Sequence, residues 1–182
     1  MTTLQERPLD KDSGSGEAYK APRTVAPYVW AVTRLSLGFV FLWAFFDKTF
    51  GLGKATPAEG AWIDGGSPTE GYLGHLEGTF ADTFSGMAGG AWADWLFMVG
   101  LLGIGIAMTL GIALRIGAAS GALLLGLMWM TALPLENNPF MDDHLVYALV
   151  LIGLAASNAG DTWGLGRTWR TMGLVRKFPV LR

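Results

Sequence analysis

The sequence contains no cysteine. This absence excludes disulfides, thiolate metal sites, cysteine-ligated iron–sulfur clusters and covalent sulfur chemistry on the chain itself. Any redox role must therefore use a bound cofactor or a partner. Positive charge is not in excess either, because 13 Lys and Arg stand against 15 Asp and Glu, for a net charge of −2. A nucleic-acid-binding protein needs a basic footprint, so we expect no nucleic acid partner.

Charged residues are scarce overall, and apolar residues are abundant. Only 15% of the chain is charged and 51% is apolar, whereas soluble domains carry about 25% charged residues. Glycine occurs 26 times, about twice its usual share of ~7%, without a collagen-like period. Glycine allows helices to approach closely in lipid. The composition thus predicts an integral membrane protein.

Four apolar stretches predict an all-α membrane protein with a bundle of four transmembrane helices, over about 28–50, 93–113, 116–135 and 143–159. The first stretch would reach ~34 Å at 1.5 Å per residue, enough to cross a ~30 Å hydrocarbon core. About 40 mostly apolar residues before position 135 form two spans rather than one. The fourth span is short, with Asp142 or Asp143 as its N-cap and Gly160 as its left-handed C-cap.

Two tails and one long loop flank these spans in a membrane domain of residues 27–166. Residues 1–26 are polar and rich in Gly, Ser and Pro, which predicts a disordered tail. Residues 51–92 are too many for a structureless connection, and their apolar spacing predicts one or two short amphipathic helices. Residues 167–182 alternate cations with apolar residues, so we expect a basic amphipathic tail lying along anionic headgroups.

The distribution of Lys and Arg predicts the orientation of the spans. In a four-span arrangement, basic residues near the span ends gather on one side, which the positive-inside rule assigns to the cytoplasm. We therefore expect a multi-pass protein of the cell membrane with both termini cytoplasmic. The outer face would be acidic. The basic residues are Lys20, Arg23, Arg115, Arg167, Arg170, Arg176 and Lys177.

One face of the first span carries a cation at each end. Arg34, Phe45 and Lys48 share a helical stripe, together with Gly38 and Phe41, at steps of three and four residues. A central charge costs roughly 2.5–3.5 kcal/mol on insertion scales, so Arg34 should face a polar partner or a cavity. One interpretation is a slot for a flat or anionic ligand. In the alternative, Arg34 pairs with an inner polar residue such as Asp161 or Asn158, and Lys48 snorkels outward.

A second polar cluster lies at the outer end of the fourth span. It consists of Asp142, Asp143, His144 and Tyr147. Histidine titrates near physiological pH, and a neighbouring carboxylate could hold its tautomer and pass protons. The alternative is a helix cap, an interfacial histidine and a belt tyrosine without catalytic use.

The two clusters fall at similar membrane depth. If the first and fourth spans are neighbours, Asp47 and Lys48 would converge with the second cluster in one outer pocket, which His75 of the loop could join. Two histidines on separate outer elements do not favour bis-histidine haem. The acidic residues show no metal-ligand spacing. We therefore expect no haem, iron–sulfur cluster or metal.

Three segments resemble one known family. They are RLSLGFVFLWAFFDK in the first span, SPTEGYL in the loop, and NPFMDDHLVYALVLIGLAASNAGDTWGLGRTW around the fourth span. Together they resemble the DoxX family, including the DoxD-like membrane subunit of thiosulfate:quinone oxidoreductase, over roughly residues 28–170. The resemblance implies four membrane helices and oxidation of thiosulfate with electrons passed to a membrane quinone. It also implies a second, smaller subunit.

These observations lead to one functional hypothesis and two alternatives. The hypothesis is a quinone-interacting redox subunit, in which His144 and Asp143 relay protons and Lys48 polarises a quinone oxygen or holds an anion. Arg34 would anchor the bound group. The other residues expected to line the quinone site are Phe45, Asp47, Asp142 and Tyr147.

The first alternative is a non-catalytic membrane scaffold for a soluble redox or sulfur enzyme. A weaker alternative is a proton-coupled carrier, which the absence of internal repeats and interrupted spans does not favour. The lipid bilayer is an expected partner in every case. Assembly into a homo-oligomer stays open.

Overall fold

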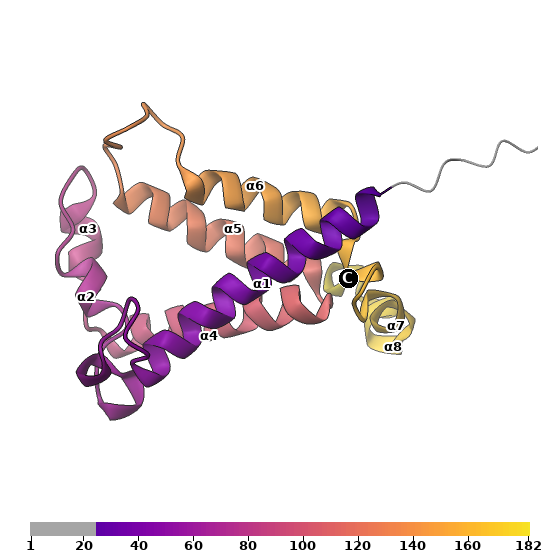
Figure 1. Cartoon of the computed structure of the whole chain (residues 1–182), viewed down its shortest axis with the longest axis horizontal. Helices are drawn as coiled ribbons and strands as arrows, with labels where there is room; N and C mark the ends of the chain where they lie inside the picture. Colours follow the sequence, from indigo (N-terminus) through magenta and orange to yellow (C-terminus); the bar gives the residue numbers. More distant parts are fainter. Residues whose placement is uncertain (1–24) are drawn as a thin grey trace, which may run out of the picture.

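The computed structural model describes residues 25–182, and this part of the chain is helical, with no β-strand. The four longest helices are α1 (Ala26–Phe50), α4 (Ala91–Leu110), α5 (Leu114–Thr131) and α6 (Asp143–Ala156). They run alternately in opposite directions along one long axis (Figure 1). Of the predicted disordered tail, residues 1–26, the first 24 lie outside the described residues, and Ala26 is the first residue of α1.

Three of these helices are long and apolar enough to cross a membrane: α1, α4 and α5. Their 25, 20 and 18 residues correspond to about 37, 30 and 27 Å. Helix α6 has 14 residues, or about 21 Å, which is shorter than the ~30 Å apolar layer. The structure therefore supports a membrane protein with three candidate spans, and the fourth span stays a prediction.

Helix α1 ends at Phe50 as predicted, but α4, α5 and α6 end three to four residues earlier than the sequence predicted. Helix α4 stops at Leu110 because Gly111 takes a left-handed conformation, with φ 71°. Helix α6 stops at Ala156 rather than near residue 159, and its left-handed residue is Asn158, with φ 50°, not Gly160. The N-terminal predictions were closer, since Asp142 is the N-cap of α6 and accepts a hydrogen bond from the backbone N–H of Leu145 at 3.1 Å.

The four helices pack as two pairs. Helix α1 lies along α4, and α5 lies along α6, while α4 also contacts α5. In Figure 1 the pairs meet on the right, where α1 begins and α6 ends, and diverge on the left. We call the two ends of the bundle the Arg34 end and the His144 end. The core between the pairs contains Leu37, Phe41, Met98, Leu101, Ile104, Met108, Leu114, Leu125, Leu151 and Leu154.

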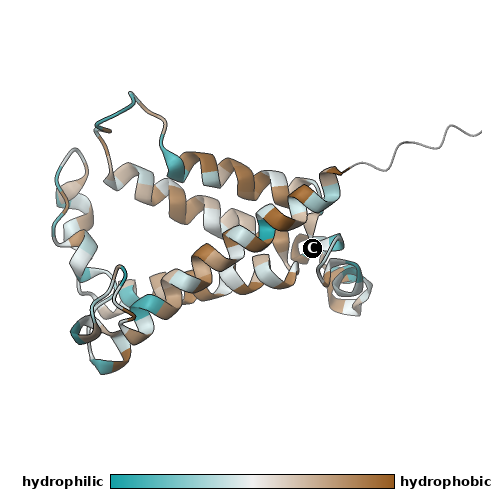
Figure 2. Ribbon diagram, in the orientation of Figure 1, coloured by the Kyte–Doolittle hydropathy of each residue, from teal (hydrophilic) through white to brown (hydrophobic). Residues whose placement is uncertain are grey.

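Large apolar side chains also cover the outside of the bundle. Figure 2 shows apolar residues along most of each long helix, with hydrophilic residues concentrated in the connecting segments. Exposed apolar surface on this scale marks a membrane or protein contact. We take it as the surface that contacts lipid. Its members include Val29, Val32, Phe39, Val40, Trp43, Phe46, Leu96, Val99, Ile106, Leu123, Leu149 and Ile152.

Short helices form the connection between α1 and α4 at the His144 end. They are η1 (Ala58–Gly60), η2 (Trp62–Asp64), α2 (Glu70–Leu73) and α3 (Ala81–Ser85). The sequence predicted short helices here, and α2 and α3 fall within the apolar spacing that indicated them. Which side of the membrane this segment occupies stays a prediction.

The chain after α6 folds against the Arg34 end. This C-terminal segment, residues 159–182, contains η3 (Ala159–Asp161), α7 (Gly166–Thr171), α8 (Gly173–Lys177) and η4 (Pro179–Leu181). The indole N–H of Trp169 donates to the carbonyl of Leu181 at 2.6 Å, and the backbone N–H of Arg115 donates to that of Arg182 at 2.9 Å. The predicted basic tail therefore contacts the start of α5, and its position along headgroups stays a prediction.

Candidate functional site

Arg34 is fully buried at the junction of α1, α4 and the C-terminal segment. Its Nη1 donates to the carbonyls of Met108 and Thr109, the latter at 2.8 Å. Its Nη2 donates to the carbonyls of Trp163 at 2.9 Å and Thr162 at 3.4 Å. Two of these carbonyls lie in the last turn of α4, where the negative end of the helix dipole favours a cation. Arg34 thus binds backbone carbonyls and joins α1 to α4 and to the C-terminal segment at the Arg34 end.

Glycines make room for this arrangement. A Cβ on Gly111 would lie 2.8 Å from the Cα of Gly160, and one on Gly164 would lie 2.5 Å from the carbonyl oxygen of Gly160. Both Cβ positions would also lie within 3.2 Å of the Arg34 guanidinium. Side chains at these positions would push the turns away from Arg34. The guanidinium therefore meets the carbonyls because the turns around it carry glycine.

Asp47 is also buried, but it serves the chain directly after α1. Its carboxylate accepts hydrogen bonds from the backbone N–H groups of Lys54, Ala55 and Thr56, at 3.1, 3.0 and 2.9 Å. Only 1% of Asp47 is exposed. This predicted site residue therefore holds the turn after α1.

Lys48 lies on the α1 and α4 side of the molecule. Its ammonium is 5.9 Å from the centre of the Phe97 ring of α4, within the range of a cation–π interaction. Phe45, one turn earlier, packs against the hydrophobic core, with its ring 5.5 Å from that of Phe46. These two predicted site residues contact aromatic side chains.

His144 and Asp142 form a hydrogen-bonded pair at the start of α6. The Nδ1 atom of His144 lies 2.7 Å from a carboxylate oxygen of Asp142. An ionised carboxylate only accepts hydrogen bonds, so Nδ1 carries the proton and Nε2 is left to exchange one. Asp143 is more exposed and lies 3.5 Å from the same Nδ1. This is the arrangement that holds one histidine tautomer for proton transfer.

The hydrogen bonds of Asp142 also change the pKa of its carboxyl group. Its partial burial alone would raise the pKa of this carboxyl group. Hydrogen bonds from the His144 side chain and the Leu145 backbone N–H outweigh that effect and lower the pKa of Asp142 below its ordinary value. Asp142 therefore stays an acceptor for His144 throughout the neutral pH range.

A groove of about 800 Å³ includes Asp142 of this pair in its lining, while His144 lies just outside the lining. One wall is formed by residues 77–78 and the other by residues 132–142, and the backbone N–H of Thr79 donates to the carbonyl of Leu133 at 3.1 Å across them. The lining combines apolar side chains, such as Leu135 and Met141, with three carboxyl groups. Those acids are Glu77, Glu136 and Asp142. The walls suit a neutral or cationic ligand and repel anions.

The structure separates the two predicted polar clusters. Helix α1 ends and α6 begins at well-separated places in Figure 1, so Lys48 and Asp47 do not converge with His144. Tyr147 is exposed on α6, one turn after His144. The other histidine, His75, is exposed and its Nδ1 contacts the carbonyl of Gly71 at 3.2 Å.

The predicted absence of a metal site can be compared with the geometry at α6. One ligand atom each from Asp142, Asp143 and His144 lie within 4.8 Å of one another. Such a set of oxygen and imidazole donors is compatible with several divalent cations. Asp142 already uses its two oxygens for Leu145 and His144. The positions of these three side chains are therefore those of a hydrogen-bonded cluster.

Comparison with known proteins identifies no family for this chain. No family model, curated protein or solved structure matches this chain. The resemblance therefore rests on the three sequence segments alone.

Sequence reasoning missed the functions of several polar residues. Asp94 in α4 accepts hydrogen bonds from Ser67 at 2.9 Å and from Thr69 at 2.6 Å, which fixes the SPT segment on the helix start. The sequence signal for this contact was Asp94 itself, a charged residue in an apolar stretch that follows SPT. The acidic groove gave no such signal, because Glu77 and Glu136 are 59 positions apart and only the fold brings them together.

Proposed function

We propose that this chain is a DoxX-like membrane subunit with four membrane helices and both termini in the cytoplasm. The three apolar helices and their exposed apolar side chains support insertion in a bilayer. Helix α6 packs along α5, and in this proposal it is the fourth and shortest span. The basic residues at the Arg34 end support a cytoplasmic position for that end.

We further propose that the groove at the His144 end binds a membrane quinone. The single observation that carries this proposal is the hydrogen bond between Asp142 and His144 at 2.7 Å, beside a groove with apolar and acidic walls. Known ligand pockets enclose about 300–1,000 Å³ and are mostly apolar with a few polar groups. This groove has a volume in that range, and half of its lining residues are polar. A flat, neutral ring would contact its apolar residues Pro134, Leu135 and Met141.

The residues of this chain would supply protons to the bound ring. Quinone accepts two electrons and two protons to become quinol. His144 would pass a proton through Nε2 while Asp142 holds Nδ1 and stabilises the imidazolium. Asp143 faces Nδ1 at 3.5 Å rather than Nε2, so solvent would return the proton to Nε2 of His144. Tyr147 would flank the imidazole on the same helix face.

The electrons would come from a small reduced sulfur donor such as thiosulfate. Two thiosulfate ions release two electrons when they couple to tetrathionate, which balances the reduction of one quinone. The acidic groove would repel this dianion. We therefore assign the donor to a second subunit or a soluble partner rather than to the groove.

The experiment measures bound quinone and quinone-dependent turnover of the purified complex. His144→Gln removes the imidazole that would exchange the proton. Asp142→Asn keeps a residue that can cap the helix but removes the carboxylate charge. We expect both variants to lose turnover by at least about a hundredfold, the usual contribution of a general acid or base. His75→Gln is the matched control and should retain full turnover.

Lys48 provides a second comparison. The sequence predicted that it acts with His144, but it lies beside Phe97 on the other helix pair. The groove proposal expects Lys48→Met to retain stoichiometric quinone, measured by mass spectrometry of a solvent extract. Loss of quinone in Lys48→Met, with retention in His144→Gln, would move the site to α1.

A scaffold remains the second candidate, because of one observation on the C-terminal segment. Met172, Leu174 and Phe178 are exposed there beside Arg176 and Lys177. Such a surface fits a soluble partner as well as a membrane surface. A scaffold would co-purify with a tightly bound soluble enzyme and without quinone, and its His144→Gln variant would be fully functional.

A further inference from the structure

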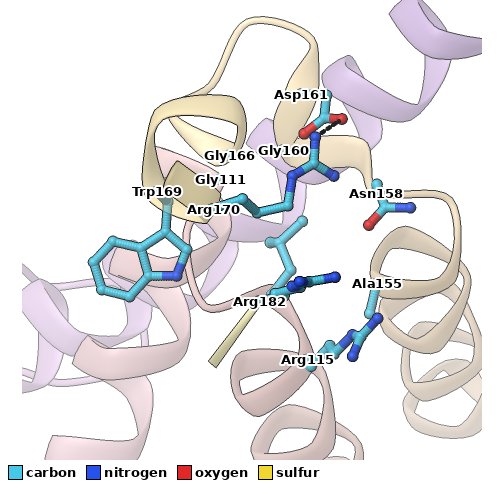
Figure 3. Close-up of a pocket in the computed structure, with 11 residues that line it drawn as sticks. Gly111, Arg115, Ala155, Asn158, Gly160, Asp161, Gly166, Trp169, Arg170 and Arg182 are labelled. Carbon is cyan, nitrogen blue, oxygen red and sulfur yellow. Dashed lines mark hydrogen bonds and ion pairs between the residues drawn. The ribbon is translucent and has the colours of Figure 1, made fainter. Parts of the chain in front are cut away.

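A pocket at the Arg34 end gathers three arginine side chains from different parts of the chain. Figure 3 shows Arg115 from the start of α5, Arg170 from α7 and Arg182 beyond η4 around one small cavity. The side chains of Arg115 and Arg182 extend to the same side, beside Ala155 of α6. The proposed quinone groove lies at the opposite end of the bundle, so this is a separate site.

The charges around this pocket do not cancel. Asp161 is the one acidic side chain in its lining, and it is bonded to Arg170 at 2.5 Å. Within residues 25–182, neither the Arg115 nor the Arg182 side chain has an ion-pair partner within 4.0 Å. Three guanidinium groups against Asp161 and the α-carboxylate of Arg182 leave one positive charge in the lining. Two cations held on one side of a pocket repel each other unless an anion binds between them.

Two further features add to the positive potential. Leu114 and Arg115 are the first residues of α5, so the positive end of this helix dipole reaches the pocket. The buried Arg34 lies directly behind Gly111 of the lining, with a guanidinium nitrogen 3.2 Å from where a Gly111 Cβ would be. Arg34 contacts carbonyls rather than a carboxylate. The wall therefore carries an additional charge that no described acid neutralises.

The size of the cavity limits how a ligand would bind. Its volume of about 20 Å³ holds roughly one water molecule. The cavity is open to solvent, and the exposed side chains of Arg115 and Arg182 lie at its mouth. A large anion would therefore insert one oxygen and leave its remainder outside. Guanidinium groups bind tetrahedral phosphate oxygens in this way, often through paired hydrogen bonds.

We propose that the pocket formed by Arg115, Arg170 and Arg182 is a binding site for a phosphate group at the membrane surface. The group comes either from an anionic phospholipid headgroup or from phosphate in solution. The pocket is at the ends of α4, α5 and α6, next to the exposed apolar side chains Trp163 and Leu165. Headgroups lie at this depth when apolar helices cross a bilayer.

The test compares two double variants of the full chain that remove the same charge. Arg115→Gln with Arg182→Gln alters the pocket. Arg167→Gln with Arg176→Gln alters exposed residues of the same C-terminal segment outside the pocket lining. Native mass spectrometry would count retained phosphatidylglycerol and phosphatidylcholine, and thermal unfolding with inorganic phosphate would measure the soluble source. Each single Arg→Gln variant is included, so that a folding defect in one does not remove the comparison.

We expect the pocket variant to lose phosphatidylglycerol affinity by at least about tenfold, which corresponds to roughly 1.4 kcal/mol. The control variant should lose less than about half that free energy, because its charges act only at long range. Stabilisation by inorganic phosphate alone, lost in the pocket variant, would also support the site and assign it a soluble ligand. Equal losses in both variants, or unchanged binding in the pocket variant, would overturn it. Quinone content separates this test from the quinone proposal, since the pocket variant should keep it.

Discussion

Arg34 carries its charge into a site where every described acceptor is a backbone carbonyl. Four carbonyls from two segments surround the guanidinium. In water, such a charge would be solvated, so burial is tolerated only because these acceptors replace the lost water. The same bonds fix α1 against α4 and the chain after α6. Arg34, which the sequence predicted to be a functional residue, therefore has a structural role at the Arg34 end.

Replacing Arg34 with Met tests this structural role. We expect a loss of more than about 3 kcal/mol of unfolding free energy, because each buried carbonyl left without a donor costs about 1–3 kcal/mol. The measurement is reversible denaturation in detergent, followed by tryptophan fluorescence. Arg167→Met on the exposed face of α7 is the control and should change stability little. Equal stability of the two variants would contradict the assignment.

Asp142 predicts a pH dependence of stability. Its folded-state pKa lies below the ordinary aspartate value, so ionised Asp142 stabilises the folded state at pH values above its unfolded pKa of about 4. This contribution is lost as the pH falls through the lower, folded pKa. Asp142→Asn lacks it, so the difference in Tm between wild type and variant should shrink from pH 6 to pH 3. A difference that is constant with pH would contradict the ionised pair.

At the residue scale, sequence reasoning located the important charges but not their partners. It required a polar partner for Arg34, and it named Asp161 and Asn158. In the structure, Asp161 instead forms an ion pair with Arg170, at 2.5 Å. The carbonyl partners were not predictable, since every residue has a carbonyl group, and only the glycine turns decide which ones point at Arg34.

At the element scale, glycine decides how closely α1 and α4 approach. A Cβ on Gly105 would lie 3.0 Å from the backbone nitrogen of Leu42 and 2.7 Å from its Cγ. A Cβ on Gly103, two positions earlier, would meet nothing within 4 Å. The two residues therefore differ although both belong to the same glycine-rich stretch. The high glycine content predicted close helix packing in general and did not distinguish these two positions.

This contrast gives a paired prediction. Gly105→Ala should destabilise the protein by about 1–3 kcal/mol, the usual cost of overpacking. Gly103→Ala should be neutral or stabilise by up to about 1 kcal/mol, because alanine has the better helix propensity. Thermal unfolding of the two variants in the same detergent provides the measurement. The assignment of Gly105 to the α1–α4 contact would be wrong if the two substitutions had the same effect.

Helix ends show why element boundaries were only partly predictable. Asp142 was recognised as a start signal, and it is the N-cap of α6 in the structure. Stop signals were less reliable, because several glycines near each end compete. Asn158 adopts the left-handed conformation although Gly160 is close by. The side-chain-free Gly160 is needed instead for contact with Gly111.

At the scale of the whole molecule, hydropathy predicted the class of protein but not its lateral arrangement. Span lengths and their order depend on composition along the chain, which the sequence provides directly. Membrane depth does not determine which helices are neighbours. Lys48 and His144 were expected at one depth, yet they belong to different pairs, α1 with α4 and α5 with α6. The expected shared pocket failed for this reason.

The orientation of the bundle can be tested because the chain has no native cysteine. Ser85 of α3 and Thr168 of α7 are exposed at opposite ends. In intact cells, a membrane-impermeant maleimide should label Ser85→Cys and leave Thr168→Cys unlabelled until the cells are permeabilised. This follows from the basic residues of the Arg34 end, which favour the cytoplasm. The reverse labelling pattern would invert the orientation.

The contacts of Arg34 also have a consequence for biosynthesis. Its acceptors follow it by 74 to 129 residues in the chain. A ribosome therefore completes α1 long before the acceptors in the chain after α6 exist, and the newly inserted helix carries an uncompensated charge during that interval. The Arg34 end can therefore be completed only after the C-terminal segment has been translated.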